Sequence, residues 1–427
     1  MSDWETTDFF NDADLVVDPY PYFEQLRNAC PVLPLPNQGV VAVTGFDEAS
    51  NIYLDSENFS SCIAFVGPFA QFPVPLEGDD VNDVIDKYRD QLPMFEHMVT
   101  MDPPAHTRER ALLMRLITTK RLKENEDFML RLSDRLLDEF VDQGQCEFIR
   151  AYSQPFAMLV VADLLGVPES EHERFREGFG LSHSPGVLGE DQSKSELNPL
   201  SWLDDQFTEY ITERRRNPRN DVLSDLALAT YPDGTLPDVT AVVRTASFLF
   251  AAGQETTAKL LAVALKYLAE RPELQDLLRE HNEQIPNFIE ESLRIESPVK
   301  ADFRMARRTT SVGGVDITAG TPVMILNGAA NRDPRRFEGS EQFRVDRLNS
   351  RGHMAFGRGN HTCPGAPLAR AEGRVSLGRI LDRVRDIRLS DEHHGPPGAR
   401  HYDYEPTWLL RGITNLHLEF TPTGTAS

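Results

Sequence analysis

One cysteine, Cys363, stands in a segment whose residue types suit metal chemistry. Residues 356–365 read Phe-Gly-Arg-Gly-Asn-His-Thr-Cys-Pro-Gly, and glycines can adopt backbone angles that other residues avoid. A helix is predicted from Ala366 onward, so Cys363 precedes a helix N-terminus, whose free amide groups should stabilise a thiolate and lower the thiol pKa. Most isolated cysteines are small buried side chains, but this context favours a thiolate ligand to haem iron.

A second unusual segment lies inside a long apolar pattern. The pattern predicts one buried helix from about Pro237 to Glu270, which would extend roughly 50 Å. Its centre reads Ala-Ala-Gly-Gln-Glu-Thr-Thr over residues 251–257, although glycine and polar side chains disfavour a buried helix. The Thr256 hydroxyl should bond the Ala252 carbonyl, bend the helix and open a groove. With Glu255, such a groove could hold dioxygen and relay protons; alternatively, Thr256 only caps a kink.

Two pairs of polar residues are spaced so that both members of each pair lie on the same face of a predicted helix. Glu291 and Arg294 lie three residues apart on a predicted helix, where opposite charges meet. His106 and Arg110 lie four apart on another, which begins after Asp102, a residue expected to cap it. Taken alone, Glu291 and Arg294 are a weak signal, and for His106 or Arg110 taken singly a surface ion pair is the more probable explanation.

Taken together, these motifs resemble the cytochrome P-450 family, specifically its soluble bacterial branch. The cysteine segment resembles the haem-thiolate loop, and residues 251–257 are similar to the oxygen-activation motif. Glu291 and Arg294 match the Glu-x-x-Arg pair, and the final strand-like segment is similar to the family's closing strand. The resemblance covers about residues 18–420.

The resemblance implies a cofactor and roles for particular residues. It implies haem b, with Cys363 as the iron ligand and Thr256 and Glu255 serving oxygen activation and proton delivery. The other haem contacts that it implies are Phe356, Gly357, His106, Arg110, Arg304 and His361. It makes Arg347 the third member of a buried ion network with Glu291 and Arg294, and it places Phe248, Ala252, Val299 and Lys300 beside the substrate.

Two features bear on the substrate. Lys300 and Asp302 stand where relatives more often place apolar residues, so they could steer a polar or carboxylate substrate or bond a haem propionate. Residues 61–100 and 180–200 are expected to be irregular substrate-access loops. Several apolar side chains suggest a sizeable hydrophobic substrate such as a terpenoid, steroid or fatty compound, or else ordinary core: Phe175, Phe179, Leu181, Val187, Leu188 and Phe248.

The predicted fold is α+β and predominantly helical. Helices are expected at about 103–142, 153–165 and 201–216, and strands near 40–44, 312–326 and 413–420. With no linker in sight, residues 1–427 are expected to form a single large haem-enclosing domain with a minor β region, preceded by an acidic tail at 1–17.

Composition narrows the function class. The 427 residues carry a formal net charge of −23, which argues against nucleic-acid binding. No apolar run reaches the roughly 18 residues of a membrane span, and the N-terminus does not predict a signal peptide or anchor. Four cysteines without a CxxC pair favour a reduced cytoplasmic compartment. A monomer is expected.

A basic island interrupts the acidic chain. Within residues 106–123, Glu109 is the single acid, and the basic residues are Arg108, Arg110, Arg115, Lys120, Arg121 and Lys123. The island, together with Arg358, is predicted to dock an acidic ferredoxin, although a solvated helix face explains it equally well. The resemblance implies that this ferredoxin and an NAD(P)H-dependent reductase supply the electrons.

The predicted activity is a monooxygenase that inserts one atom of O2 into a C–H bond of a hydrophobic small molecule. One alternative is a haem-thiolate sensor or ligand-binding protein without turnover. Another is a peroxygenase that uses hydrogen peroxide directly. The acid–alcohol pair Glu255–Thr256 argues against both, because neither needs a proton relay of this kind.

Overall fold

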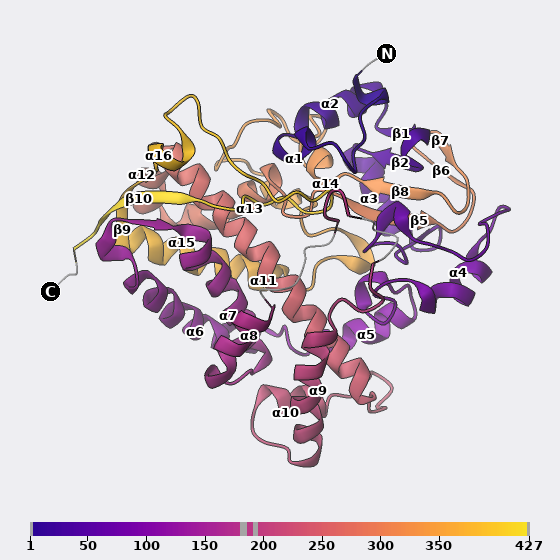
Figure 1. Cartoon of the computed structure of the whole chain (residues 1–427), viewed down its shortest axis with the longest axis horizontal. Helices are drawn as coiled ribbons and strands as arrows, with labels where there is room; N and C mark the ends of the chain where they lie inside the picture. Colours follow the sequence, from indigo (N-terminus) through magenta and orange to yellow (C-terminus); the bar gives the residue numbers. More distant parts are fainter. Residues whose placement is uncertain (1–2, 180–185, 191–194, 425–427) are drawn as a thin grey trace.

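The long helix α11 (Val239–Glu270) crosses the molecule and organises its helical part. The computed structural model describes residues 3–179, 186–190 and 195–424. In it α11 runs diagonally from the end formed by α9 (Ser201–Arg216) and α10 (Val222–Ala227) to the end formed by α12 (Pro272–Glu280) and β10 (His417–Pro422) (Figure 1). The Asp238 side chain caps it by accepting a hydrogen bond from the Ala241 amide at 2.7 Å. The predicted helix over 237–270 is therefore confirmed to within two residues.

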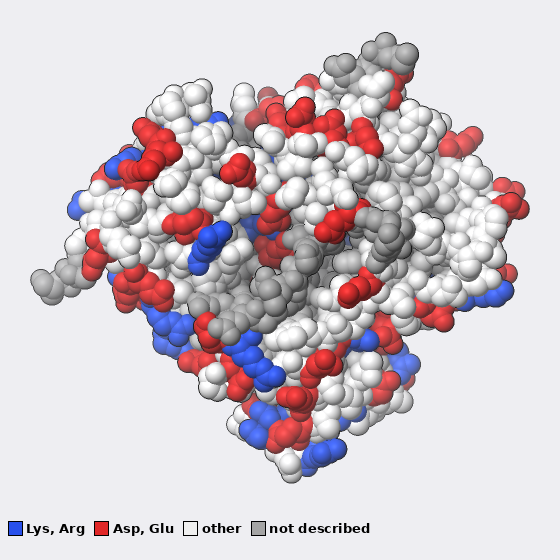
Figure 2. Space-filling model, in the orientation of Figure 1, with Lys and Arg blue, Asp and Glu red and all other residues white. Residues whose placement is uncertain are grey.

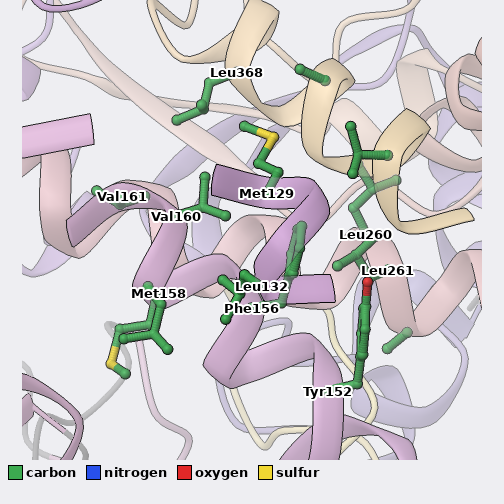
Figure 3. Packing of buried hydrophobic residues seen from close by; sticks show 14 of the residues in the cluster. Met129, Leu132, Tyr152, Phe156, Met158, Val160, Val161, Leu260, Leu261 and Leu368 are labelled. Atoms are coloured by element: carbon green, nitrogen blue, oxygen red, sulfur yellow. The ribbon is translucent and has the colours of Figure 1, made fainter. Parts of the chain in front are cut away.

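Helix α7 (Gln154–Leu165) packs closely against α11. A Cβ atom at Gly253 would lie only 2.9 Å from Cγ2 of Val161, so glycine at this position lets the two helices approach. Figure 3 shows Phe156, Val160 and Val161 of α7 and Leu260 and Leu261 of α11, which belong to one hydrophobic cluster. The glycine that looked anomalous in the sequence thus has a packing role.

The helix predicted over 103–142 is two helices, α5 (Ala105–Leu113) and α6 (Thr119–Asp138). Thr118 caps α6 by accepting a hydrogen bond from the Arg121 amide at 3.2 Å, which fixes a new start after the break. The other helices are α1 (Asp14–Val17), α2 (Tyr20–Ala29), α3 (Phe46–Leu54), α4 (Asn82–Tyr88), α8 (His172–Phe179), α9 (Ser201–Arg216), α10 (Val222–Ala227), α12 (Pro272–Glu280), α13 (Ile285–Ile295), α14 (Asn327–Ala330), α15 (Ala366–Arg383) and α16 (Asp391–His394).

Small sheets complete the α+β fold, as predicted. Strand order is β1-β2-β8-β5-β3 in the largest sheet, β4-β10-β9 in the second and β6-β7 in the third. Strands β2 and β8 are parallel, with Val41 opposite Val323, and the other pairs are antiparallel. The strands are β1 (Val32–Leu35), β2 (Val40–Val43), β3 (Phe59–Ser60), β4 (Gln145–Glu147), β5 (Asp302–Ala306), β6 (Thr310–Val312), β7 (Val315–Ile317), β8 (Pro322–Ile325), β9 (Val384–Leu389) and β10 (His417–Pro422).

Two segments differ from expectation. Residues 61–100 are not wholly irregular, because they contain α4, and Ile63 and Ile85 in them are fully buried. The acidic N-terminal segment is not a free tail, because Phe9 and Phe10 are buried and the Phe10 ring contacts Trp408 with 5.4 Å between centroids. Of the expected 180–200 loop, only 186–190 and 195–200 lie within the described residues.

Acidic side chains outnumber basic ones, as the net charge of −23 requires. On the face seen in Figure 2, acidic side chains are spread over the whole outline, and Lys and Arg lie mainly in its lower half among further acids. None of the helices in the described ranges combines the length and apolarity that crossing a bilayer would need.

Candidate functional site

The cysteine segment forms a tight loop in front of α15. Gly357 and Gly359 have positive φ angles of 62° and 67°, which favour glycine. A Cβ at Gly359 would also lie 2.3 Å from the Tyr53 carbonyl oxygen. The Cys363 amide donates to the Phe356 carbonyl at 2.8 Å, which closes the loop and presents Cys363 at the start of the helix.

The electrostatics of Cys363 correct one expectation. The amides of Gly365 and Ala366 and the charge of Arg110 lower the pKa of the thiol, but burial raises it more, so the pKa lies above its ordinary value. Burial dominates because it penalises an isolated thiolate. The loop therefore offers donors to a thiolate, and a bound metal cation would supply the remaining stabilisation.

Two histidines and two arginines gather beside the cysteine loop. The His106 and His361 rings lie 4.0 Å apart between centroids, Arg110 Nη2 donates to the Thr362 carbonyl at 2.6 Å, and Arg304 pairs with Asp302 at 2.9 Å. Burial, reinforced by neighbouring arginines, lowers the pKa of His106 to about 4 and that of His361 to about 2.

Several polar atoms of this cluster have no hydrogen-bond partner within the part of the chain that the structure describes. They are Nδ1 and Nε2 of His106, Nε2 of His361 and Nη1 of Arg110, all buried. Buried donors are normally satisfied, and an arginine charge beside imidazole nitrogens without partners suits an anionic group. The cluster therefore fits the two propionates of a haem whose iron Cys363 would bind.

On α11, the side chains of Thr256 and Glu255 each have a bonded partner within the same helix. Thr256 Oγ1 donates to the Ala252 carbonyl at 2.9 Å, which is the bond expected from the sequence. Glu255 Oε1 lies 2.7 Å from Nζ of Lys259, one turn further along. Residues 251–257 all remain helical, and Ala252 is exposed.

The sequence prediction missed a second acid near this segment. Glu372 of α15 is fully buried and accepts a hydrogen bond from Thr257 Oγ1 at 3.1 Å. Burial raises the pKa of this carboxyl well above its usual range, because an apolar interior favours the neutral form. The sequence feature that could have revealed Glu372 is its position nine residues after Cys363, among apolar residues of the predicted helix.

Glu291, Arg294 and Arg347 meet in a fully buried network. Arg294 donates to both carboxylate oxygens of Glu291 at 2.8 Å, and Arg347 Nε reaches Glu291 at 3.0 Å. These contacts lower the pKa of Glu291 against the opposing effect of burial. The network joins α13 to residues 344–347, which lead into the cysteine loop.

A neighbouring network, centred on Glu290, was not predicted. Its carboxylate accepts from Arg370 Nε at 2.6 Å and lies 3.0 Å from His353 Nε2. These partners outweigh burial and lower the pKa of Glu290 to about 2. The Arg370 guanidinium lies 4.7 Å from the centre of the Phe356 ring, so this network supports the loop directly.

Comparison with known proteins identifies the family. The model of the cytochrome P450 family matches residues 200–386. The chain is also 34% identical over 413 residues to cytochrome P450 144 of Mycobacterium tuberculosis, covering 96% of this chain and 90% of that relative. The chain belongs to the cytochrome P450 family. Among other relatives of this P450, 6-deoxyerythronolide B hydroxylase of Saccharopolyspora erythraea is 31% identical, covering 94% of this chain and 95% of the hydroxylase.

Solved structures agree with this assignment. Cytochrome P450 CYP150A6 of Mycobacterium marinum, in the substrate-free form, superposes with a TM-score of 0.93 and 59% identity, covering 99% of this chain and 100% of that one. CYP109E1 of Bacillus megaterium in complex with corticosterone gives a TM-score of 0.77 and 27% identity, covering 94% and 98%. This P450 is thus a monooxygenase of a family that uses haem b, O2 and NAD(P)H through redox partners.

The four residues expected beside the substrate are spread over two segments. Phe248 and Ala252 lie one turn apart on α11, with the Phe248 ring 6.3 Å from that of His97. Val299 forms an isolated bridge with Leu410. Lys300 is buried beside Gly328 of α14, and burial with the charge of Arg411 lowers its pKa to about 7.

Of the two alternatives left open for Phe175, the structure supports ordinary core, because Phe175 is fully buried with its ring 5.2 Å from Phe250 and 5.8 Å from Phe207. One other sequence expectation fails in this P450. Asp102 does not cap α5; its carboxylate accepts from the Ser61 amide at 2.8 Å and pairs with Arg89. The side chain of Phe179, and Leu181 as a whole, lie outside the described residues.

The basic island is only partly available at the surface. Arg108 lies 3.8 Å from the centre of the Tyr231 ring, and Arg115 donates to the Thr230 carbonyl at 2.7 Å. Lys120 is highly exposed and forms a loose pair with Glu124 at 3.8 Å. Arg358 is occupied internally, since it donates to the Gly352 carbonyl and stacks 4.9 Å from the Phe46 ring centre.

Proposed function

We propose that this P450 inserts one atom of O2 into a C–H bond of a hydrophobic small molecule, with residues 1–427 acting as one haem-enclosing unit. The supporting observation is the juxtaposition of the hydrogen-bonded Cys363 loop with the unsatisfied polar atoms of His106, Arg110 and His361. A thiolate donor and an anion-binding cluster side by side match the two ends of a haem–protein contact.

In this proposal each site residue has a defined task. Cys363 would bind the iron, Phe356 and Gly357 would lie against the macrocycle, and the residues that would receive the propionates are His106, Arg110, Arg304 and His361. When bound, the haem supplies the activation of oxygen and the redox chemistry. The networks around Glu290 and Glu291 hold the loop that carries these residues.

Thr256 and Glu255 are proposed to manage protons on the other side of the haem. Because the Thr256 hydroxyl gives its hydrogen to the Ala252 carbonyl, its oxygen can accept a hydrogen bond from a water molecule above Ala252. Glu255 lies one residue earlier, where its carboxylate can exchange a proton with that water. General acid–base help of this kind contributes roughly a hundredfold or more to rate.

A hydrophobic substrate of about steroid size is proposed. Two solved structures of one relative support this size, since CYP109E1 is described in complexes with corticosterone and with testosterone. Phe248, Ala252, Val299 and Lys300 are proposed as its neighbours. Lys300 is the residue that would distinguish a substrate with an anionic or carbonyl group, because it is a buried lysine in this segment.

The electrons are proposed to come from an acidic ferredoxin and its NAD(P)H-dependent reductase. The exposed docking residues are Arg115, Lys120 and Lys123, with the partly buried Arg121 between them, near the α5–α6 junction that leads to Arg110 and the cysteine loop. We also propose that the enzyme is monomeric and cytoplasmic. The cytoplasmic compartment is supported by the four cysteines, which are all unpaired.

The test is spectroscopic and then chemical. Purified, reduced protein treated with carbon monoxide should show the red-shifted Soret band of thiolate-ligated haem, and Cys363→Ala should lose it. The matched control is Cys146→Ala, which removes a thiol on β4, far along the chain from the loop, and should keep the band. A wild-type protein without this band would refute the proposal.

Turnover with testosterone or corticosterone, a plant-type ferredoxin and its reductase should then give a hydroxylated product. Binding of these steroids without product under any reductant would instead support a ligand-binding protein. Product formed only with added hydrogen peroxide would support a peroxygenase.

A further inference from the structure

Lys259 lies between two carboxylates that come from distant parts of the chain. Its Nζ is 2.7 Å from Oε1 of Glu255, one turn earlier on α11, and 2.8 Å from Oε2 of Glu405. The lysine side chain is only 4% exposed, whereas the two carboxylates are 27% and 24% exposed. One buried ammonium therefore serves two partly buried acids, and any displacement of Lys259 changes the surroundings of both.

Glu405 belongs to a closed turn over residues 404–413, which we call the 404–413 turn. Tyr404 pairs with Ile413 in an isolated bridge, and the Glu405 amide donates to the Gly412 carbonyl at 2.9 Å. Inside the turn, Thr407 Oγ1 bonds both the carbonyl and the amide of Leu410. These bonds fix the direction in which Glu405 leaves the backbone.

Gly412, across the same turn, provides the space through which Lys259 passes. A Cβ atom there would lie 2.6 Å from Cγ, 2.7 Å from Cε and 2.9 Å from Cδ of Lys259. Its φ is not positive, so clearance rather than backbone conformation is the reason for glycine. The aliphatic stem of Lys259 thus lies flat against the turn, and its ammonium group is held at the end of that contact.

The 404–413 turn also contacts the two segments expected around the substrate. Its Thr407 bridges Val187, and the Trp408 amide donates to the Gly186 carbonyl at 2.9 Å. On its other side Leu410 bridges Val299, and the Lys300 amide donates to the Leu409 carbonyl at 3.0 Å. A single turn therefore joins residues 186–188 and 299–300 to Lys259.

We propose that Lys259 is a positioning residue for Glu255, and that the 404–413 turn sets the position of Lys259 through Glu405 and Gly412. Proton delivery by Glu255 then depends on how the turn is packed. A substrate that orders residues 186–188 or 299–300 would thereby place the acid for catalysis. The inference rests on the proton-relay role proposed for Glu255, which is why one of its two tests needs no turnover.

The first test is amide hydrogen exchange of the haem-loaded protein without substrate. Lys259→Met and Gly412→Ala should each speed exchange in the peptide covering residues 403–414 about tenfold, because charge-assisted bonds of this kind hold such segments closed. The matched control is Lys266→Met, which removes another α11 lysine, paired with Glu270 at 3.3 Å, and should leave that peptide unchanged. Equal exchange in Lys259→Met and wild type would overturn the link between turn and lysine.

The second test is turnover of testosterone with the surrogate ferredoxin system. Lys259→Met should lower kcat about tenfold while KM changes little, and it should raise both the peroxide released and the solvent isotope effect, as Thr256→Ala should. Lys266→Met should do none of this even if it lowers the melting temperature equally. Unchanged peroxide release and isotope effect in Lys259→Met would refute its positioning role, whereas a wild type that forms no product would refute the proposed activity instead.

Discussion

At the scale of single residues, the site holds ionisable groups whose charge depends on burial more than on their type. His106, His361, Cys363 and Glu372 all have pKa values shifted toward the neutral form, with burial as the largest cause. Glu290 is shifted the other way, because Arg370 and His353 surround it. Neighbours in space, not neighbours in sequence, decide which of the two occurs.

Lys300 allows a direct test of this principle. Its pKa falls from 10.5 to about 7 in the folded protein, so the unfolded chain binds more protons than the folded one between about pH 7 and pH 10. The free energy of unfolding should therefore rise with pH across this window. Lys300→Met should be more stable than wild type at pH 6, by roughly 1.4 kcal/mol per unit of pKa shift, and this advantage should shrink toward pH 10.

The measurement is thermal unfolding of both proteins in a series of buffers from pH 6 to pH 10. Lys87→Met, at an exposed position on α4, serves as the control and should follow the wild-type trend. A constant difference between Lys300→Met and wild type across the series would show that the amine is not destabilised by burial.

At the scale of elements, the approach of α11 to α7 is the most demanding contact. Gly253→Ala would place a methyl group 2.9 Å from the fully buried Val161. We expect a loss of about 1–3 kcal/mol from overpacking, which exceeds the gain of up to about 1 kcal/mol from better helix propensity. Gly378→Ala on α15 meets no atom within 4 Å and should be neutral or stabilising. Chemical denaturation of the two variants compares them directly.

Residue spacings within single helices predicted much of the secondary structure and several local contacts. The extent of α11, the Thr256–Ala252 bond and the meeting of Glu291 with Arg294 follow from periodicity within one helix. The contacts that failed or were missed join residues far apart in the chain. Glu405 lies 146 residues from Lys259, and such partners depend on tertiary packing that no local pattern encodes. The sequence of its loop identified Cys363 as a candidate ligand. The direction of its pKa shift could not be predicted, because it depends on how deeply the thiol is buried.

At the scale of the whole molecule, net charge and local charge oppose each other. An acidic protein would repel an acidic ferredoxin unless a basic surface directs the encounter. Arg115→Glu with Lys120→Glu should slow reduction by ferredoxin about tenfold or more at low salt. The difference should shrink as the screening length falls from about 30 Å at 0.01 M to about 8 Å at 0.15 M salt.

Stopped-flow reduction of the haem by ferredoxin at several ionic strengths would measure this effect. Lys87→Glu on α4 is the matched charge reversal outside the island, and reduction of the double variant by dithionite controls for damage to the site. If the double variant and Lys87→Glu behaved alike, the docking surface would lie elsewhere.

The buried pair Phe10 and Trp408 has a consequence for biosynthesis. At a translation speed of about 5–20 residues per second, the phenylalanine leaves the ribosome roughly 20–80 seconds before its indole partner is made. During that interval the Phe10 ring can pack against Phe69, 5.1 Å away in the folded protein, but not against the indole. This corner of the protein is therefore completed only after residue 408 has been made, and a chaperone that shields those rings until then would raise the yield of folded enzyme.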